Sequence, residues 1–336
     1  MLVPADEVAQ TALRALSAVA PPEHARDQAD HLIEAELRGI SSHGILRLPR
    51  ILRRISNKVA DPGATGDHVW RSEGFLAVDG QKGLGPVVAL RAIDALEQRV
   101  KQTGIAVAAI NNSNHIGMLG YYAERAARRG HSMIILSTSE ALVHPWGGRR
   151  AMIGTNPIAI GLPIGREEIF MMDTATGVVS MGEIHDRANR GEPIPIGWAV
   201  DKEGNPTTDA SAAKSGAIAP FGGAKGYALG LAFELLVTSL AGAAVGRRVV
   251  GTLDDDRICN KGDLIILIDG PSTDLRAYLE ALRSEEPADG FAEVIIPGER
   301  GREARAQRLR DGIEVPDQLW REICGFDGVA TGGLKK

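Results

Sequence analysis

Short apolar runs of strand length alternate with segments of helical periodicity from about residue 75 onward. The apolar runs lie at 75–78, 105–110, 133–136, 158–160 and 169–172, and helical periodicity is present at 87–101 and 121–129. Apolar runs of this length are typical of strands buried in a sheet. An alternation of strands and helices predicts helices packed on the faces of that sheet. The middle of the chain is therefore predicted to form an α/β sheet.

The segments on either side of this region are predicted to be mainly helical. Helical periodicity covers 4–20 and 23–38, and a third helix is expected to begin near Ser41, because serine is favoured at the start of a helix. The elements expected later are a long ordered loop at 191–223, a buried helix at 226–246, a strand at 264–268, a helix at 273–284, a strand at 293–296 and helical residues at 300–326.

The composition is that of an ordinary globular protein. The chain has 336 residues, of which 44% are hydrophobic and 24% are charged, enough for a full-sized core. A formal net charge of −5 gives no basic surface for nucleic acid. The arginine clusters at 47–54 and 125–129 are interpreted as solvated helix faces or subunit contacts, with Arg47 excepted.

Nothing in the sequence predicts export or insertion into a membrane. The N-terminus lacks the basic head and apolar core of a secretory signal. The nearly uncharged stretch 226–246 contains Glu234 and is rich in Gly and Ala, which favours a buried helix over a membrane span. Cys259 and Cys324 have no CxxC spacing, so neither a disulfide framework nor a zinc site is supported. We expect a soluble cytoplasmic protein with no metal.

Ser42, His43 and Arg47 are the most informative candidates for a catalytic site. His43 and Arg47 are four residues apart, a spacing that on a helix stacks both side chains on one face. An imidazole exchanges a proton near neutral pH, and the planar guanidinium binds a carboxylate through two parallel hydrogen bonds. The pair suits a small 2-oxo or 2-hydroxy acid. Taken alone, it also fits an exposed helix surface, with Ser42 as a helix cap.

Further polar segments follow the predicted strands. His115 comes after the 105–110 strand, at the end of a strand where α/β sheets collect ligand sites. Thr155 lies in a Gly-Thr-Asn-Pro turn, and Asp173 begins a run of small residues that lets a phosphate or ribose approach the backbone. Lys225 lies in a glycine-rich segment before a helix, where backbone amides hold a pyrophosphate. Each segment also fits an ordinary polar turn.

Common catalytic motifs are absent from the sequence. There is no GxxxxGK[ST] segment, and no GxGxxG segment opens a helix after a strand, so neither a P-loop NTPase nor a Rossmann dehydrogenase is indicated. The lack of HExxH, DxDxDG and GxSxG segments weakens the metalloprotease, EF-hand and hydrolase interpretations. The residues alone indicate an α/β enzyme that acts on a small anion.

Several motifs occur in order between about residues 38 and 245. They read SSHGILRLPR, VDGQKGLGP, NNSNHIGMLGYYAERAARRG, HPWGGRRAMIGTNPIAIGLP, DTATG, IPIGWAVDKEGNPTTDA and FGGAKGYALGL. In this order they closely resemble the type II malate/L-lactate dehydrogenase family of NAD(P)-dependent oxidoreductases. The resemblance implies the malate/L-lactate dehydrogenase-type α/β fold, with a non-Rossmann NAD(P)-binding sheet domain at 75–269. It also implies a helical substrate and dimerisation domain built from 1–74 and about 270–336.

The resemblance also implies the chemistry. Members transfer a hydride at the carbon next to a carboxylate, with NAD or NADP as cofactor, and are typically homodimers or larger. Their activities include oxidation of malate, lactate, sulfolactate and ureidoglycolate, and reduction of diketogulonate and of cyclic imines such as piperideine-2-carboxylate. The implied partner is therefore a small-molecule carboxylate, with no role for nucleic acid or a membrane.

Functional residues can be carried over motif by motif. The resemblance implies that His43 is the proton donor and acceptor, with Ser42 beside it in a relay and Arg47 as the carboxylate anchor. It also implies that His115 is a second active-site histidine, which in some relatives itself has the acid/base role. Substrate contacts are implied for Thr155, Met181 and Gly182. Dinucleotide contacts are implied for Asp173, Thr174, Ala175, Lys225, Gly298 and Arg300.

One departure from the family pattern leaves the substrate open. Where many hydroxyacid-oxidising relatives have a Gly-Lys pair, this chain has Gly182-Glu183. An acid here resembles the cyclic-imine reductases, in which it joins a relay with Ser and His. A buried carboxylate at Glu183 is expected to favour a charged imidazolium at His43. The leading hypothesis is a dehydrogenase of 2-hydroxy acids such as malate or lactate, and the alternative is a reductase of cyclic imino acids.

Overall fold

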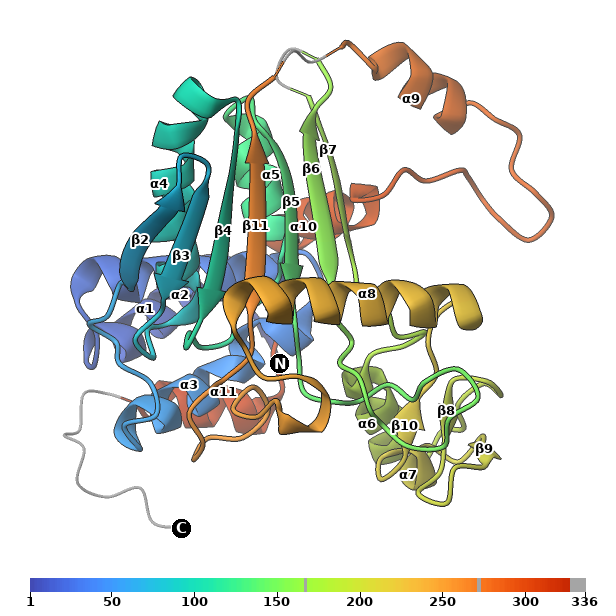
Figure 1. The fold of residues 1–336 in the computed structure, drawn as a ribbon. Helices are drawn as coiled ribbons and strands as arrows, with labels where there is room; N and C mark the ends of the chain where they lie inside the picture. Colours follow the sequence, from blue (N-terminus) through green and yellow to red (C-terminus); the bar gives the residue numbers. More distant parts are fainter. Residues whose placement is uncertain (166–167, 271–272, 327–336) are drawn as a thin grey trace.

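A seven-stranded sheet forms the centre of the computed structural model, which describes residues 1–165, 168–270 and 273–326 (Figure 1). The strand order is β2-β3-β4-β11-β5-β6-β7. The strands are β2 (Asp67–Ser72), β3 (Phe75–Asp79), β4 (Ile105–Asn111), β5 (Ser132–Ser137), β6 (Ile158–Pro163), β7 (Ile169–Thr174) and β11 (Asp263–Ile268). β3 and β4 are parallel, whereas β11 runs antiparallel to both β4 and β5. The sheet is mixed, and β4, β5 and β7 end at the same edge.

Most of these strands follow from the apolar runs in the sequence. Each predicted run between 75 and 172, and the one at 264–268, lies inside an observed strand. No apolar run indicated β2, because it is an edge strand with mostly exposed residues. The strand predicted at 293–296 is wrong, because these residues pair with no strand in the described part of the chain and only Ile296 among them is buried.

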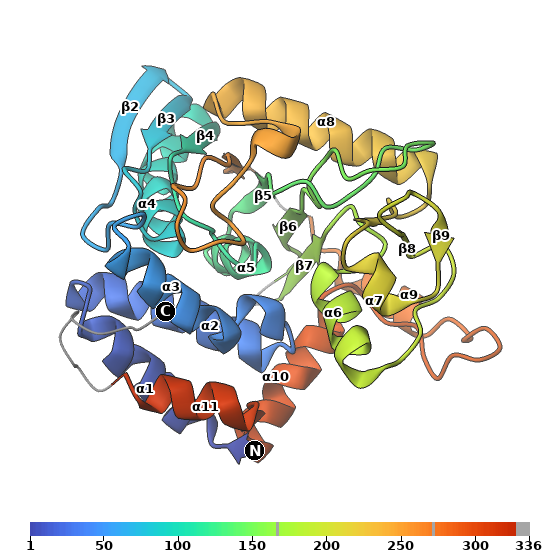
Figure 2. The same ribbon diagram turned by 90° about the horizontal axis from the view of Figure 1, so that it is seen from below.

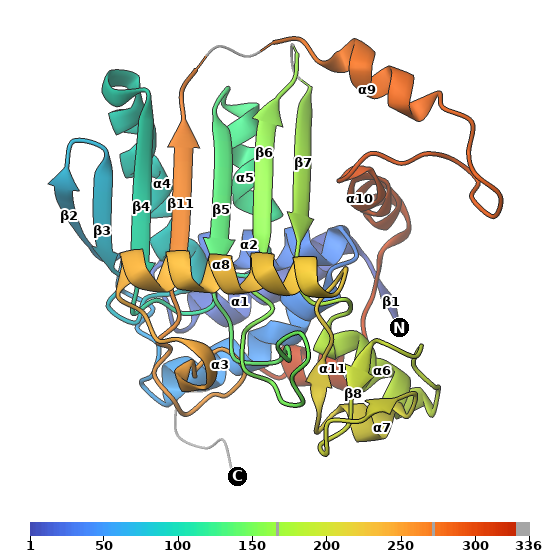
Figure 3. The ribbon, with the colours of Figure 1, turned by 45° about the vertical axis from the view of Figure 1, so that its right-hand side comes forward.

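Helices cover both faces of the sheet. α4 (Gly85–Thr103) and α5 (Gly120–Arg128) pack on one face, where Leu96 and Tyr122 are buried against the strands. α8 (Ala224–Ala241) runs across the other face, as Figure 3 shows. The sheet with its two helical layers confirms the predicted α/β fold.

Only one face of α8 is buried, so the prediction of a buried helix holds for that face alone. Val237 and Ala241 pack on the sheet with residues of β4, β5 and β11. The opposite face exposes Leu229, Leu235, Leu236 and Leu240. In the described part of the chain α8 is also the single helix long and apolar enough to cross a membrane by length and composition, a test that core helices of soluble proteins also pass.

The N-terminal and C-terminal segments share a core below the sheet (Figure 2). Leu16, Leu32 and Leu48 pack there with Ile313 and Trp320. The elements are β1 (Leu2–Val3), α1 (Ala5–Ser17), α2 (Pro22–Leu37), α3 (Leu48–Ser56), α10 (Glu299–Asp311), β12 (Ile313–Glu314) and α11 (Asp317–Cys324). The two-domain division stays a prediction, and parts of its C-terminal segment, 271–272 and 327–336, lie outside the described residues.

A small lobe and a separate helix complete the fold. The predicted loop at 191–223 in fact contains a three-stranded sheet of order β10-β8-β9 and a short helix, elements too short to leave a periodic pattern. They are β8 (Ala199–Val200), β9 (Pro206–Thr207), α7 (Ala210–Ala213) and β10 (Ala217–Ile218), which share a core with α6 (Met181–Arg190). α9 (Arg276–Arg283) confirms the helix predicted at 273–284. The helical region predicted at 300–326 is two helices, α10 and α11, separated by β12.

Candidate active site

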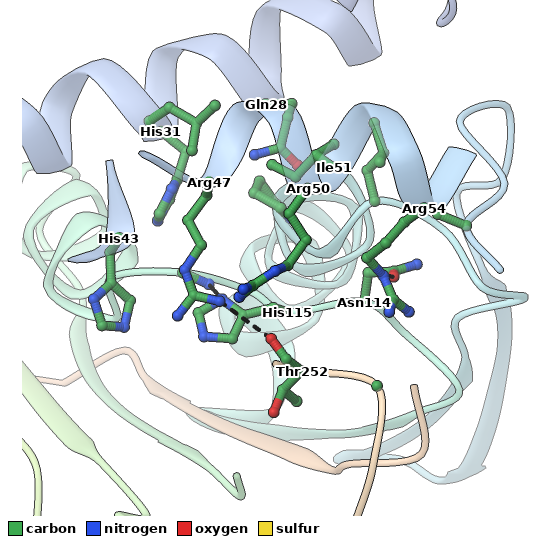
Figure 4. A pocket seen from close by; sticks show the side chains of 16 residues that line it. Gln28, His31, His43, Arg47, Arg50, Ile51, Arg54, Asn114, His115 and Thr252 are labelled. Atoms are coloured by element: carbon green, nitrogen blue, oxygen red, sulfur yellow. Dashed lines mark hydrogen bonds between the residues drawn. The ribbon is translucent and has the colours of Figure 1, made fainter. Parts of the chain in front are cut away.

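A cavity of about 40 Å³ lies where α2, α3 and the 41–47 turn meet the loops beside β4 and β11. Figure 4 shows His43, Arg47, Arg50 and His115 directed toward it, with Thr252 opposite. We call it the His–Arg cavity. The structure brings together His43, Arg47 and His115, from two separate motifs, in the lining of one space, and their catalytic roles stay predictions.

The 41–47 turn is built around the buried carboxylate of Glu36. The Ser41 hydroxyl and the Ile45 amide donate hydrogen bonds to its two oxygens, each at 3.0 Å. The same carboxylate leaves room only for glycine at position 44, because a Cβ there would lie 2.4 Å from Oε1 of Glu36. Glu36 therefore fixes the shape of the turn, a role that its helical periodicity in α2 did not reveal.

His43 and Arg47 do not share one helix face, so this part of the prediction is wrong. Ser41–His43 and Ile45–Arg47 form two separate 3₁₀ turns, and α3 begins only at Leu48. The backbone of Gly44 leaves the helical region between them, with φ −94° and ψ −144°. The two side chains reach the same cavity because the chain bends at this glycine.

The imidazole rings of His43 and His115 lie close together, with 5.3 Å between their centroids. The Ser42 hydroxyl is hydrogen-bonded to Nδ1 of His43 at 2.9 Å. The backbone amide of Gly117 donates to Nδ1 of His115 at 2.9 Å. A neutral imidazole that accepts at Nδ1 carries its proton on Nε2, so His115 presents a donor to the cavity.

Both histidines are neutral at physiological pH. Burial lowers the pKa of His43 to about 3, and the positive charge of Arg47 adds to this effect. Burial also lowers the pKa of His115 well below its ordinary value, again with contributions from Arg47 and His43 and a smaller one from Lys261. Burial thus makes protonation of both rings costly, and Arg47 adds to the cost because it places a positive charge beside them.

Glu183 does not act on His43 as the sequence suggested. Its carboxylate accepts a hydrogen bond from Nε of Arg187 at 2.8 Å, one turn along α6, and 39% of its side chain is exposed. The charges that shift the pKa of His43 are those of Arg47 and His31. The expectation of a charged imidazolium stabilised by a buried Glu183 is therefore wrong.

The neighbouring Met181-Gly182 pair does approach the site. A Cβ on Gly182 would lie 3.7 Å from Cβ of Ser42, so the first turn of α6 faces the Ser42 side of the turn. Ser180 caps this helix by accepting a hydrogen bond from the Glu183 amide at 3.1 Å. Met181 packs against the core of the small lobe. The contact places Gly182, rather than Glu183, beside the Ser42-His43 pair.

The guanidinium of Arg47 is held by two backbone carbonyls. Its Nε donates to Ser42 O at 2.8 Å and its Nη1 to Thr252 O at 3.1 Å. Burial lowers the pKa of Arg47 to about 10, so the group remains charged at neutral pH. Among the described residues, its Nη2 donates no hydrogen bond. This nitrogen is available for an incoming carboxylate.

The Thr252 loop is held in turn by Glu140, a residue that the sequence did not single out. Oε1 of Glu140 accepts hydrogen bonds from the Thr252 amide and the Leu253 amide, each at 2.9 Å, and from the Thr252 hydroxyl at 3.0 Å. Glu140 follows β5 at the sheet edge where β4 and β7 also end. A single carboxylate thus positions the carbonyl that orients Arg47.

The arginines of α3 are not solvated as the sequence suggested. Arg54 is buried and uses all three nitrogens, donating to Asn114 Oδ1 at 2.9 Å, Asp254 O at 2.9 Å and Arg257 O at 3.0 Å. Arg50 lines the His–Arg cavity. Their interpretation as a solvated face is therefore wrong. The i, i+3 spacing from Arg47 to Arg50 was the signal that could have indicated a shared site.

Thr155 does not line the cavity but is connected to it. Its amide donates to Ser139 Oγ at 2.9 Å, and the two hydroxyls are 3.2 Å apart. Ser139 precedes Glu140, so this link joins the Thr155 turn to the residue that holds Thr252. The substrate contact implied for Thr155 stays a prediction.

Glu234 of α8 fixes the same turn. Its buried carboxylate accepts hydrogen bonds from the Gly154 amide at 3.0 Å, the Asn156 side chain at 2.7 Å and the Gly246 amide at 2.6 Å. Asn156 has a φ of +33°, a conformation that few side chains adopt. The carboxylate compensates for this strained backbone by satisfying the donors around it.

Asp173 lies at the end of β7 and caps α5. Its Oδ2 accepts a hydrogen bond from the Gly120 amide at 2.7 Å, and a negative charge at a helix N-terminus is favourable. Burial nevertheless raises the pKa of Asp173 to about 6. Thr174 and Ala175, the next residues, are exposed at the sheet edge. They leave backbone accessible to a ligand.

The other residues expected to contact a dinucleotide lie at two helix N-termini. Lys225 is exposed in the first turn of α8, which follows Gly223, and Arg300 is exposed in the first turn of α10, which follows Gly298. Both glycines have positive φ, and neither helix has a side-chain cap. Open amides at a helix N-terminus with a nearby cation fit a pyrophosphate. None of these residues is among those that line the His–Arg cavity.

Comparison with known proteins gives a consistent result along the whole chain. A family model described as malate/L-lactate dehydrogenase matches residues 3–324. The chain is 37% identical over 320 residues to an L-sulfolactate dehydrogenase of Methanocaldococcus jannaschii, with 92% of each chain covered. It is 36% identical over 327 residues to a Δ1-pyrroline-2-carboxylate/Δ1-piperideine-2-carboxylate reductase of Pseudomonas aeruginosa, with 96% and 98% covered. A crystal structure of a dehydrogenase from Sinorhizobium meliloti aligns with a TM-score of 0.93 and 50% identity over 97% and 98% of the two chains.

Proposed function

Because the chain belongs to the malate/L-lactate dehydrogenase family, we propose that it transfers a hydride between a nicotinamide cofactor and C2 of a small 2-hydroxy or 2-oxo acid. The observation that carries this proposal is the His–Arg cavity, in which two neutral imidazoles lie beside a guanidinium with a nitrogen to spare. The two imidazoles and the guanidinium together suit a carboxylate with an adjacent carbon–oxygen group.

Arg47 anchors the substrate carboxylate. Its Nε and Nη1 are fixed by backbone carbonyls, so the plane of the guanidinium is set before the substrate arrives. The free Nη2 then donates a charge-assisted hydrogen bond to a carboxylate oxygen. A preset anchor places C2 of the substrate at the two histidines.

His43 exchanges the proton of the reacting oxygen, and His115 orients that oxygen. A hydroxyl both donates and accepts, so Ser42 tolerates either neutral tautomer of His43, and Nε2 of His43 can take up or release a proton. The Gly117 amide holds His115 with its proton on Nε2, where it can only donate. The low pKa of His43 keeps it ready to accept the proton of a hydroxy acid.

NAD or NADP supplies or accepts the hydride when it is bound. The exposed backbone of Thr174 and Ala175, and the α8 terminus with Lys225, are suited to its phosphates and ribose. We also propose that Gly298 and Arg300, at the start of α10, contact the dinucleotide. The choice between the two cofactors is decided by the assay below.

Reduction of cyclic imino acids is a second candidate function. The similarity to the Pseudomonas aeruginosa reductase favours it. In this structure, however, Glu183 is paired with Arg187 and not with the Ser42-His43 pair. The dehydrogenase therefore remains the better-supported activity.

The exposed apolar face of α8 supports a homodimer. Leu229, Leu235, Leu236 and Leu240 form one apolar surface on a helix whose other face is already packed on the sheet. Surfaces of this kind mark protein interfaces. Since members of the family are typically homodimers or larger, the partner proposed for this surface is a second copy of the chain.

The function is tested by following the absorbance of NADH and of NADPH with purified protein. Oxaloacetate, pyruvate and cyclic imino acids are offered separately. We expect oxidation of one of the two cofactors with at least one 2-oxo acid. Turnover with the cyclic imines alone would replace the dehydrogenase by the reductase.

A further inference from the structure

Arg50 is a cation in the His–Arg cavity that has no partner among the residues that the structure describes. It lies one turn after Arg47, and Figure 4 shows the two side chains side by side, directed toward His115 and Thr252. Arg50 makes no hydrogen bond and no ion pair with any residue in the described part of the chain. Its neighbours on α3 differ, since Arg53 is paired with Asp255 and Glu322.

The surroundings of Arg50 offer no compensating charge. The cavity lining contains Arg47, Arg50 and Arg54 but no aspartate or glutamate. The nearby carboxylate of Glu140 already accepts hydrogen bonds from the Thr252 loop. Arg50 lowers the pKa of Arg47 and contributes in the same direction at Arg54, so the three guanidiniums repel one another. An anion that enters this space relieves the repulsion.

The Nη2 nitrogen of Arg47 and the guanidinium of Arg50 together fit a substrate with two acidic ends. The Nη2 nitrogen of Arg47 is already assigned to the carboxylate beside C2. Arg47 and Arg50 are three residues apart at the start of α3, and Figure 4 shows both side chains directed into the same cavity, where they can meet the two ends of a short diacid. A substrate with one carboxylate, such as lactate or a cyclic imino acid, leaves the guanidinium of Arg50 without an anionic partner in the cavity.

We propose that Arg50 binds a second anionic group of the substrate, so that the preferred substrates are 2-hydroxy or 2-oxo acids with a further carboxylate or sulfonate on the adjoining carbon. The assignment rests on the proposed function and narrows its substrate class. It makes Arg50 a specificity residue that contacts the substrate but takes no part in the proton or hydride transfer.

The test compares the Arg50→Gln variant with a matched control on the same helix. Arg53→Gln removes a guanidinium that is paired outside the cavity, so it controls for loss of charge from α3. The quantity measured is the ratio of kcat/KM for oxaloacetate to kcat/KM for pyruvate. Loss of one charge-assisted hydrogen bond predicts a fall in this ratio of about 10- to 100-fold in Arg50→Gln, mainly through KM for oxaloacetate. The ratio should be unchanged in Arg53→Gln, and Arg50→Lys should recover part of it.

The outcomes separate this proposal from the function on which it rests. If the wild-type protein reduces pyruvate as well as oxaloacetate, and Arg50→Gln leaves the ratio unchanged, the function stands and the role of Arg50 is refuted. An equal loss on both substrates also refutes it, because a merely structural role has that effect. If no 2-oxo acid is turned over, the proposed function fails, and thermal shifts with malate and with lactate decide the role of Arg50. A malate-specific shift that Arg50→Gln abolishes supports it, and equal shifts overturn it.

Discussion

The imidazole rings of His43 and His115 lie with centroids 5.3 Å apart and their planes inclined by 42°. Their Nδ1 atoms have different partners, a serine hydroxyl for His43 and a backbone amide for His115. The hydroxyl permits either tautomer, whereas the amide permits one. This difference supports the proposed roles, proton exchange for His43 and hydrogen-bond donation for His115.

Replacement of His43 by alanine should lower kcat by about 100-fold or more, the usual contribution of a general acid or base. The measurement is steady-state turnover of the best 2-oxo acid at saturating cofactor. His68, on the edge strand β2, provides the matched control, and its alanine variant should keep the wild-type rate. An unchanged kcat in the His43 variant would remove this residue from the mechanism.

The rate of hydroxy acid oxidation should not fall at acidic pH in the way that protonation of an ordinary histidine, with a pKa of 6.5, would cause. A group whose pKa falls from 6.5 to about 3 stays neutral, and so stays a base, throughout the range between those values. We therefore expect kcat/KM, which reports the free enzyme, to change little between about pH 5 and about pH 8 on account of His43. A tenfold loss per pH unit below about pH 6.5 would show that burial does not suppress protonation of the ring.

Replacement of Gly117 by alanine should destabilise the fold and impair catalysis together. A Cβ at this position would lie 1.9 Å from Cε1 of His31, and the φ of +77° is unfavourable for alanine. We expect a loss of about 2–4 kcal/mol in the free energy of unfolding, since both overpacking and backbone strain contribute. The loss of kcat should accompany it, because the Gly117 amide orients His115.

Gly130 provides the control for this substitution. Its φ of +86° is equally unfavourable, but no atom lies within 4 Å of a Cβ built there. Gly130→Ala should therefore lower the free energy of unfolding by about 1 kcal/mol, from backbone strain alone, and leave kcat unchanged. Equal destabilisation of the two variants in denaturant melts would show that the contact with His31 is not what makes Gly117 necessary.

A charge on the exposed face of α8 should dissociate the proposed homodimer. Leu235 and Leu236 are 53% and 44% exposed in the single chain, and a buried carboxylate without a partner is unfavourable in an interface. Sedimentation equilibrium should give a dimer for the wild-type protein and a monomer for the Leu236→Glu variant. Tyr278→Glu on α9 is the control. A wild-type monomer at micromolar concentration would refute the interface.

Much of the fold is predictable from the sequence because its strands are buried and apolar. The runs that became β3 to β7 and β11 carry the signal of strands that lie inside a sheet. The insertion of β11 between β4 and β5 depends on contacts between residues more than 120 positions apart, which periodicity does not encode. Composition indicates that α8 is an apolar helix but not which of its faces pack against the rest of the protein. Its exposed face was therefore not predicted.

The site was predicted less completely, because its support comes from side chains with no motif. His43, Arg47 and His115 were found from residue type and family resemblance. Glu36 and Glu140 were not, since a buried carboxylate that accepts backbone hydrogen bonds looks like any other glutamate on a helix or loop. Glu183 was overinterpreted because its partner Arg187 lies one helical turn away, a pairing that the sequence already allowed.

The most direct test of the central claim is the fate of a deuterium label on the reduced nicotinamide. The protein is incubated with a 2-oxo acid and with NADH or NADPH labelled at C4 in one or the other stereochemical position, and the product is analysed by mass spectrometry. Direct transfer predicts one deuterium at C2 of the hydroxy acid from one of the two labelled forms. A hydroxy acid product that carries no deuterium from either form would contradict hydride transfer at C2.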